Sequence, residues 1–240
     1  MDMPTDIQHQ VMGYDRTATM FSPEGHLLQV EYAERTVRLG SSSIGFVCTD
    51  GVLIIADKRL NDKLLAPKSL SKIYEIDGHI ISTAAGISSD ARILIEKAQL
   101  MAQQHRVTYD SPVEPELVIK EVANTQQMFT QYGGARPFGV SVMIAGINKT
   151  KPEVFISDVT GNYFSYIAGV IGENDERIRE KLREYYKLST IEDGIKLGLK
   201  IFKDIQEKNF DINRLEVSFV KNDNPEVVKL DGEKLKKYIK

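Results

Sequence analysis

The sequence predicts an α+β fold, a four-layer α/β/β/α sandwich of two antiparallel sheets flanked by helix pairs. Two observations lead to this prediction. Short β-rich runs separated by turn residues alternate along the chain with pairs of amphipathic helical segments, an order that favours stacked sheets with helices outside. No repeat, low-complexity tract or Pro/Ser-rich linker divides the 240 residues. We therefore expect a single sandwich domain over residues 41–240 and an N-terminal extension over residues 1–40.

The extension is predicted to contain a turn followed by a helix. Ser22 and Pro23 in the run FSPEG are typical of a turn. The apolar residues after it recur at helical spacing: Leu27, Val30, Ala33 and Val37. Gly40 ends this pattern, so we expect an amphipathic helix that ends where the core begins.

From Ser43 the pattern changes to short β-rich runs, followed by two helices. The runs are SIGFVCT, GVLIIAD, SKIYEI and HIISTAA. One helix is expected from about Ser88 and the next after the Pro112/Pro115 region. Their predicted apolar positions are Ala91, Leu94, Ala98 and Met101 in the first helix, and Leu117, Val118, Val122 and Met128 in the second.

The second half of the chain repeats this order. GVSVMIAGI and PEVFIS predict two strands, and a turn at residues 160–162 leads to a third, YFSYIA. Helices are expected from about Asn174 and from about Ser189, and RLEVSFVK predicts a last strand.

Composition and motifs exclude several classes of function. A formal net charge of -3 gives no reason to expect a nucleic-acid or anionic-membrane partner, because such partners usually need a concentrated basic face. The longest apolar runs are far below the roughly 18 residues of a membrane span. The first ten residues lack the pattern of a signal peptide, so we expect a cytoplasmic protein. The single cysteine, Cys48, lies in an apolar run and is expected to be a buried hydrophobe.

Common catalytic and metal-binding motifs are missing from the sequence. It contains no Walker loop, GxSxG, HExxH or CxxC. The histidines show no metal-ligand spacing; they are His9, His26, His79 and His105. We expect no metal and no cofactor.

One candidate nucleophile remains, at the start of the first core strand. A four-layer sandwich that begins with hydroxyl residues resembles the N-terminal nucleophile hydrolases, in which the chain is cut before Ser, Thr or Cys and the freed amine acts as the base. Ser41, after Gly40, would be that residue, and Asp57 and Lys72 match the acidic residue and lysine of proteasome catalytic subunits. The mechanism needs a free α-amino group, with a pKa near 8, at Ser41. It therefore requires removal of residues 1–40, although their turn and helix favour a segment that is retained.

The run GYDRTATMFSPEGHLLQVEYA, residues 13–33, closely resembles the N-terminal signature of proteasome α-type subunits. The resemblance continues in ADKR (56–59), SLSKI (69–73), GISSDAR (86–92) and QYGGARPFGVS (131–141), and so covers most of the chain. It is strongest to the archaeal kind, which forms a homo-heptameric ring. The resemblance implies a non-catalytic subunit of the 20S core that gates the entry of unfolded polypeptides. The β subunits hydrolyse them, and the C-terminal tails of activating AAA ATPases dock on the α ring.

The resemblance also implies roles for individual residues. Tyr14, Asp15, Pro23 and Tyr32 match the cluster that holds the gate open, after a flexible gate segment that precedes Tyr14. Lys72 matches the lysine that receives the tail carboxylate, and the other pocket positions are Gly40, Gly86, Ile87 and Glu31. Tyr132, Gly133 and Gly134 match the loop that narrows the entrance.

Each of these positions also has a simpler structural interpretation. Asp15 could cap a local turn, Tyr32 could pack in the core, Lys72 could be a solvated strand residue, and QYGG could only end a helix with a glycine cap. The sequence departs from the family at Leu39 and His26, where basic residues are more usual, and at Thr17, where a small apolar residue is usual. The charge missing at Leu39 puts tail affinity in doubt, although Arg38 remains beside it.

Three hypotheses therefore stand. The first is a non-catalytic ring subunit, the second an autoprocessed hydrolase that uses Ser41, and the third a small-molecule enzyme of the same fold without a ring. Chain length and assembly state distinguish them.

Overall fold

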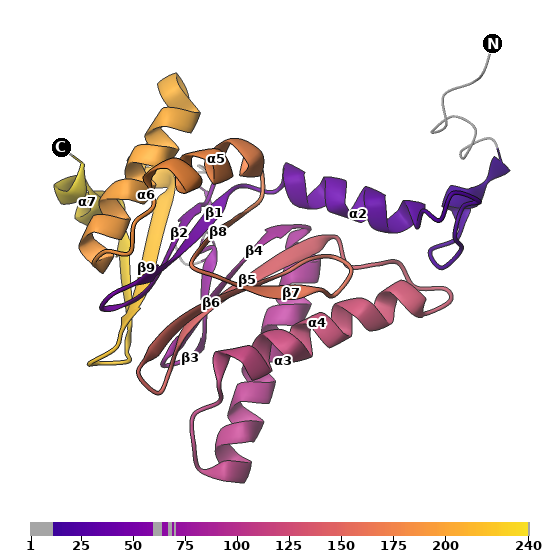
Figure 1. Cartoon of the computed structure of the whole chain (residues 1–240), viewed down its shortest axis with the longest axis horizontal. Helices are drawn as coiled ribbons and strands as arrows, with labels where there is room; N and C mark the ends of the chain where they lie inside the picture. The colour runs from indigo at the N-terminus through magenta and orange to yellow at the C-terminus, as the bar shows by residue number, and fades with distance from the viewer. Residues whose placement is uncertain (1–11, 60–63, 67–68, 70, 240) are drawn as a thin grey trace.

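The computed structural model describes residues 12–239, apart from 60–63, 67–68 and 70. Two antiparallel five-stranded sheets lie at its centre (Figure 1). The first sheet has the order β10-β9-β2-β1-β8 and the second β3-β4-β5-β6-β7. The strands are β1 (Ser43–Cys48), β2 (Gly51–Asp57), β3 (Ile73–Asp77), β4 (Ile80–Gly86), β5 (Val140–Asn148), β6 (Lys151–Ser157), β7 (Tyr163–Tyr166), β8 (Ala168–Ile171), β9 (Leu215–Lys221) and β10 (Val227–Asp231).

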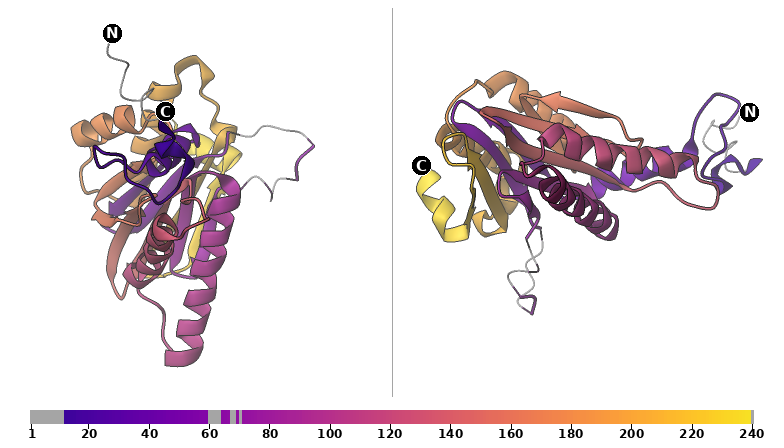
Figure 2. Two further views of the ribbon diagram at one scale, coloured as in Figure 1. Left: turned by 90° about the vertical axis from the view of Figure 1, so that its right-hand side faces the viewer. Right: turned by 90° about the horizontal axis from the view of Figure 1, so that it is seen from below.

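Helices cover the outer faces of both sheets, which confirms the predicted four-layer sandwich. They are α2 (Leu28–Leu39), α3 (Ser88–Tyr109), α4 (Pro115–Gln131), α5 (Asp175–Tyr185), α6 (Ile191–Gln206) and the short α7 (Gly232–Leu235). Helices α3 and α4 pack on the second sheet, and α5 and α6 pack on the first. Helix α2 extends from the sandwich toward residues 12–27, at the end where the α4–β5 loop also lies (Figures 1 and 2).

Strand β2 shows why the sequence folds into stacked sheets. All of its residues are buried. Val52 and Ile54 belong to the core between the sheets, whereas Leu53 and Ile55 belong to the core under α6. Side chains of a strand alternate between its two faces, so a strand buried on both faces must be apolar throughout.

The predicted helix starts agree with the structure to within two residues. Asn174 is the N-cap of α5. The Thr190 side chain caps α6 by accepting a hydrogen bond from the Asp193 N–H at 3.3 Å. Cys48 is buried as expected, and burial raises its pKa to about 12.

Two expectations were wrong in detail, and two elements were not predicted. YFSYIA is not one strand, because β7 pairs with β6 in the second sheet and β8 pairs with β1 in the first, so the chain changes sheets at Ile167. Leu117 and Met128 are 39% and 44% exposed, because the buried face of α4 is centred on Val118 and Val122. Strand β10 and helix α7 had no counterpart among the predicted elements.

Two properties of the described residues bear on function. Within residues 12–239 and their stated gaps, no cluster of three or more His, Cys, Asp or Glu side chains is placed to hold a metal ion. None of the helices described is long and apolar enough to cross a membrane.

Candidate functional site

Lys72 lies just before β3 and reaches the start of the first sheet. Its Nζ donates hydrogen bonds to the Ser41 hydroxyl at 2.6 Å and to the Ser41 carbonyl oxygen. Burial lowers the pKa of Lys72 to about 8; the nearby carboxylates of Asp57 and Glu173 favour its charged form, and the Arg59 charge opposes it. The ammonium group is therefore mostly charged at pH 7, but it is held in a partly desolvated position.

Glycines bring three backbone segments together beside this lysine. A Cβ on Gly40 would lie 2.3 Å from the backbone nitrogen of Gly86, and a Cβ on Gly86 would lie 2.1 Å from the Gly139 carbonyl oxygen. Gly86 also has a φ of +125°, which favours glycine. The Ile87 N–H donates to the same Gly139 carbonyl at 2.9 Å. These contacts define one corner of the molecule, which is bordered by Lys72, Gly40, Gly86 and Ile87.

Glu31 lies elsewhere in this chain. It is in the first turn of α2, where its Oε1 lies 2.5 Å from Nδ1 of His26. At 1.5 Å of rise per residue, the helix places Glu31 about 13 Å from Gly40. Within one chain, Glu31 and Lys72 are not brought together.

Asp57 is fully buried and its hydrogen bonds serve the fold. Its carboxylate accepts from the Arg214 and Gln206 side chains at 2.7 Å each and from the Arg59 N–H at 2.8 Å. Arg214 and Gln206 are far from Asp57 in sequence, and no pattern in the chain marked them as its partners.

Arg59 and Glu173 are two further site residues that sequence reasoning missed. The Arg59 guanidinium donates to the Leu39 carbonyl oxygen at 3.0 Å and pairs with the Glu173 carboxylate. The Glu173 N–H donates to the Gly40 carbonyl oxygen at 2.7 Å, which ties the end of α2 to the loop after β8. Arg59 therefore places a positive charge beside Leu39, the position where the sequence lacks one. Its place in the ADKR motif was the only signal in the sequence.

The residues matched to the gate cluster lie near the start of α2. Tyr14–Arg16 forms a single 3-10 turn, and the Asp15 carbonyl oxygen accepts a hydrogen bond from the Gln29 side chain at 2.6 Å. Tyr32 is half-buried on α2, and Pro23 is exposed in the preceding turn. Residues 1–11, most of the expected gate segment, lie outside the described residues.

The loop after α4 is exposed and lies at the same end. Tyr132 is 65% exposed, and the Ala135 N–H donates to its carbonyl oxygen at 3.3 Å. Tyr132 is the C-cap of α4 in an extended conformation, and Gly134, two residues later, has the left-handed φ of +83°. The structure therefore does not support the interpretation that QYGG only ends α4 with a glycine cap.

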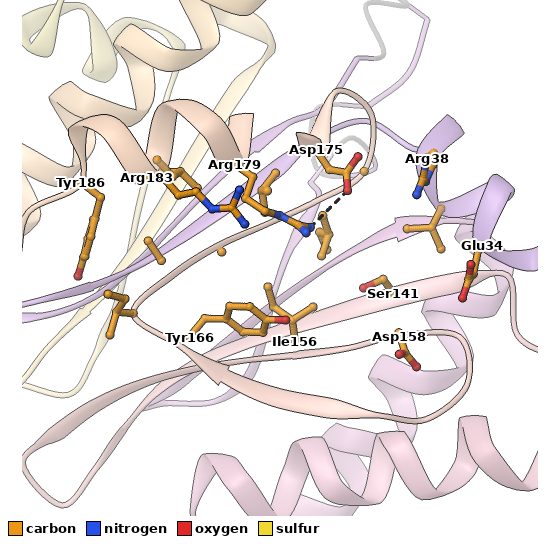
Figure 3. A pocket seen from close by; sticks show the side chains of 18 of the residues that line it. Glu34, Arg38, Ser141, Ile156, Asp158, Tyr166, Asp175, Arg179, Arg183 and Tyr186 are labelled. Carbon is orange, nitrogen blue, oxygen red and sulfur yellow. Dashed lines mark hydrogen bonds and ion pairs between the residues drawn. The ribbon is translucent and has the colours of Figure 1, made fainter. Parts of the chain in front are cut away.

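A separate cavity of about 640 Å³ lies between α2, α5 and β8 (Figure 3). Arg183 and Arg179 extend into it from α5, and Arg179 contacts Asp175 at 3.4 Å. Burial and the negative charge of Asp158 raise the pKa of Glu34 on the opposite wall. Within the described part of the chain, the residues lining this cavity include none of the predicted site residues.

The four-layer fold and the contact between Ser41 and Lys72 indicate the class of protein. A four-layer sandwich in which a lysine contacts a serine two residues before the first strand, β1, is consistent with an N-terminal nucleophile hydrolase fold. A family model described as proteasome subunit matches residues 37–220, and one that describes the N-terminal signature of the proteasome A-type subunits matches residues 14–35. The chain belongs to the proteasome subunit family and carries its α-type signature.

Curated archaeal proteins named as the alpha subunit of the proteasome are similar over nearly the whole chain. The protein of Methanosphaerula palustris is 39% identical over 229 residues, which cover 95% of each chain. That of Archaeoglobus fulgidus is 40% identical, covering 95% of this chain and 93% of the relative. That of Pyrococcus horikoshii is 39% identical, covering 95% and 87%.

Proposed function

We propose that this chain is a non-catalytic α-ring subunit of a 20S proteasome core. In this proposal, a homo-heptameric ring of the chain stacks on proteasome β subunits, controls the entry of unfolded polypeptides and docks the C-terminal tails of an activating ATPase. The α-type signature and the similarity to archaeal proteasome α subunits support the assembly. The observation that carries the docking role is the partly desolvated Lys72 ammonium in a corner lined by glycine backbone.

The chemistry of this corner suits a carboxylate at a chain end. Lys72 carries the positive charge, and the Arg59–Glu173 ion pair lies nearby. An ion pair in a partly closed pocket is screened less than an exposed pair, which contributes about 0–1 kcal/mol. Glycines at 40 and 86 let the backbone segments beside Lys72 pack closely against one another. Several tails docking on one ring would gain from avidity.

Glu31 fits this pocket only if a neighbouring copy supplies it. It lies at the far end of α2 from Gly40 in its own chain. We therefore place the pocket between adjacent subunits, with Lys72 from one copy and Glu31 from the next.

The gate is proposed to lie at the end formed by the N-terminal segment and the loop 132–134. Residues 12–27 and this loop lie on the same side of the sandwich (Figures 1 and 2). Tyr14, Asp15, Pro23 and Tyr32 would stabilise the open gate between copies. One hydrogen bond to a charged carboxylate contributes about 1.5–3 kcal/mol, and repetition around a ring would shift an open–closed equilibrium.

The autoprocessed hydrolase remains the second candidate, because Lys72 donates to the Ser41 hydroxyl at 2.6 Å. It requires a chain cut before Ser41. Native mass spectrometry, followed by denaturation in the same run, separates the two. A seven-fold assembly of intact 27.0 kDa chains is expected. A chain that begins at Ser41 would establish the hydrolase instead, and an intact monomer or dimer would favour an enzyme without a ring.

The docking role is tested by replacing Lys72 with Ala in a reconstituted α–β particle. Ring assembly should remain, and stimulation of peptide hydrolysis by the ATPase or by its C-terminal tail peptide should be lost. The matched control is Lys196→Ala, because Lys196 is an exposed lysine on α6 that pairs with Glu192 at 2.8 Å. Full stimulation of the Lys72→Ala particle would refute the pocket.

A further inference from the structure

Gly139, just before β5, connects three parts of the chain through hydrogen bonds of its backbone groups. Its carbonyl oxygen accepts hydrogen bonds from the Ile87 N–H at 2.9 Å and from the Thr36 hydroxyl at 2.8 Å. Its own N–H donates to the Asp90 carboxylate at 2.9 Å. A Cβ at this position would lie 2.6 Å from the Thr36 hydroxyl oxygen and 2.7 Å from the Ile87 side chain. Helix α2, the start of α3 and β5 are thus held together at a point where any larger residue would require the Thr36 and Ile87 side chains to move.

Asp90 extends this junction to the loop after α4. It lies in the first turn of α3, and its side chain is 9% exposed. Both terminal nitrogens of the Arg136 guanidinium donate to its two oxygens, at 2.6 and 2.7 Å. Such bidentate pairs fix geometry as well as charge. Burial alone would raise the pKa of Asp90, but the hydrogen bonds from Arg136 and from the Gly139 N–H hold it below its ordinary value.

The turn that precedes Arg136 has few attachments of its own. A Cβ at Gly133 or Gly134 would meet no atom within 4 Å. The end of the loop nearest β5 is held against α4, because the ring of Phe138 lies 4.7 Å from the ring of Phe129 on that helix. Arg136 also donates to the Pro137 carbonyl oxygen at 2.9 Å, which stiffens the loop beside the pair.

We infer that the Asp90–Arg136 pair positions the loop 132–135 by fixing it to the Gly139 junction. Because Asp90 is anchored to Gly139 and Arg136 belongs to the loop, the pair is the side-chain link between the exposed turn and the start of α3. Without it, the turn would keep its backbone connections and the packing of the buried Pro137 and Phe138. The consequence of this positioning for substrate entry rests on the proposed function, in which the loop 132–135 narrows the pore.

The positioning role can be measured directly on the assembled ring. The only native cysteine, Cys48, is buried, and burial raises its pKa, so a Tyr132→Cys ring can be labelled selectively with a nitroxide. Diluting the label with a diamagnetic analogue avoids broadening between copies. Arg136→Gln in this background should narrow the electron paramagnetic resonance lines clearly. The matched control is Arg92→Gln, which removes an exposed pair with Glu96 on the same helix and should leave the lines unchanged.

A second readout links positioning to entry. In α–β particles, Arg136→Gln should raise the rate of casein hydrolysis several-fold relative to that of a tetrapeptide, because the larger substrate is more sensitive to the width of the pore. Unchanged line shapes would overturn the inference. Narrowed lines with an unchanged ratio of rates would keep the positioning role and refute the proposed pore loop. If Arg136→Gln rings do not assemble, Arg136→Lys, which keeps the charge but not the two-pronged geometry, should give the same direction of change.

Discussion

The proposed docking of a carboxylate on Lys72 predicts that tail affinity falls as the pH rises through about 8. The pKa of Lys72 is lowered to about 8, first by burial. About 0.9 of the molecules then carry the ammonium at pH 7, and about 0.1 at pH 9. If only the charged form binds, the apparent dissociation constant scales inversely with that fraction. The affinity should therefore fall about tenfold between pH 7 and pH 9, which corresponds to about 1.4 kcal/mol.

The sign of this change is specific to Lys72. Lys72 is the group of this corner whose pKa is lowered into this range of pH, to about 8. The assay is fluorescence anisotropy of an N-acetylated tail peptide titrated with the α–β particle at constant ionic strength. The same peptide with a C-terminal amide should bind weakly at every pH. Lys196→Ala should keep the wild-type profile, because Lys196 lies on the exposed face of α6.

An affinity that is constant between pH 7 and pH 9, or that increases, would refute the reasoning. A constant affinity would mean that the tail contacts the backbone of the corner and not the ammonium. A fall that persists in Lys72→Ala would assign the titration to another group.

Three further predictions concern the backbone junction and its ion pair. Gly86→Ala should lower the midpoint of thermal unfolding strongly, because its Cβ would lie 2.1 Å from the Gly139 carbonyl oxygen and the backbone φ there is +125°. The control Gly133→Ala should change the midpoint little, because a Cβ at Gly133 would meet no atom within 4 Å. Asp90→Asn should reduce the free energy of unfolding, measured by urea denaturation, by about 1.5–3 kcal/mol, because it removes hydrogen bonds to a charged group. An unchanged urea midpoint would show that the Asp90–Arg136 pair does not stabilise the fold. Because the pKa of Asp90 is held below its ordinary value, the stabilisation by Asp90 should be complete above about pH 4 and lost as the pH falls further, and Asp90→Asn should flatten this part of the stability profile.

Periodicity was sufficient for most of the fold. The continuous apolar run of β2 and the helical spacing of apolar residues in α3 both follow from burial, which the local sequence records directly. The boundary between β7 and β8 was not predictable in this way. Tyr163–Tyr166 and Ala168–Ile171 form one uninterrupted β-rich run, and only their pairing with different sheets separates them.

The candidate site was only partly predictable, for a physical reason. The resemblance named Lys72 and the glycines at 40 and 86, and the structure places them together. It did not indicate that Arg59 pairs with Glu173, because those residues lie 114 positions apart and no period relates them. Asp90 and Arg136 stood inside the motifs GISSDAR and QYGGARPFGVS, so the sequence marked both segments without showing that they form one pair.

The contacts around Gly40 bear on whether Ser41 could serve as a nucleophile. The Gly40 carbonyl oxygen accepts from the Glu173 N–H at 2.7 Å, and the Gly40 N–H donates to the Val37 carbonyl oxygen at 3.0 Å. A cut before Ser41 would separate Gly40 and α2, whose Thr36 hydroxyl donates to the Gly139 carbonyl oxygen, from the chain that follows. The segment therefore belongs to the structure that shapes the corner, and while it stays attached the α-amino group of Ser41 is an amide that cannot act as a base. Lys72 then contacts a serine that is not activated in this way, which leaves its charge available to an incoming carboxylate.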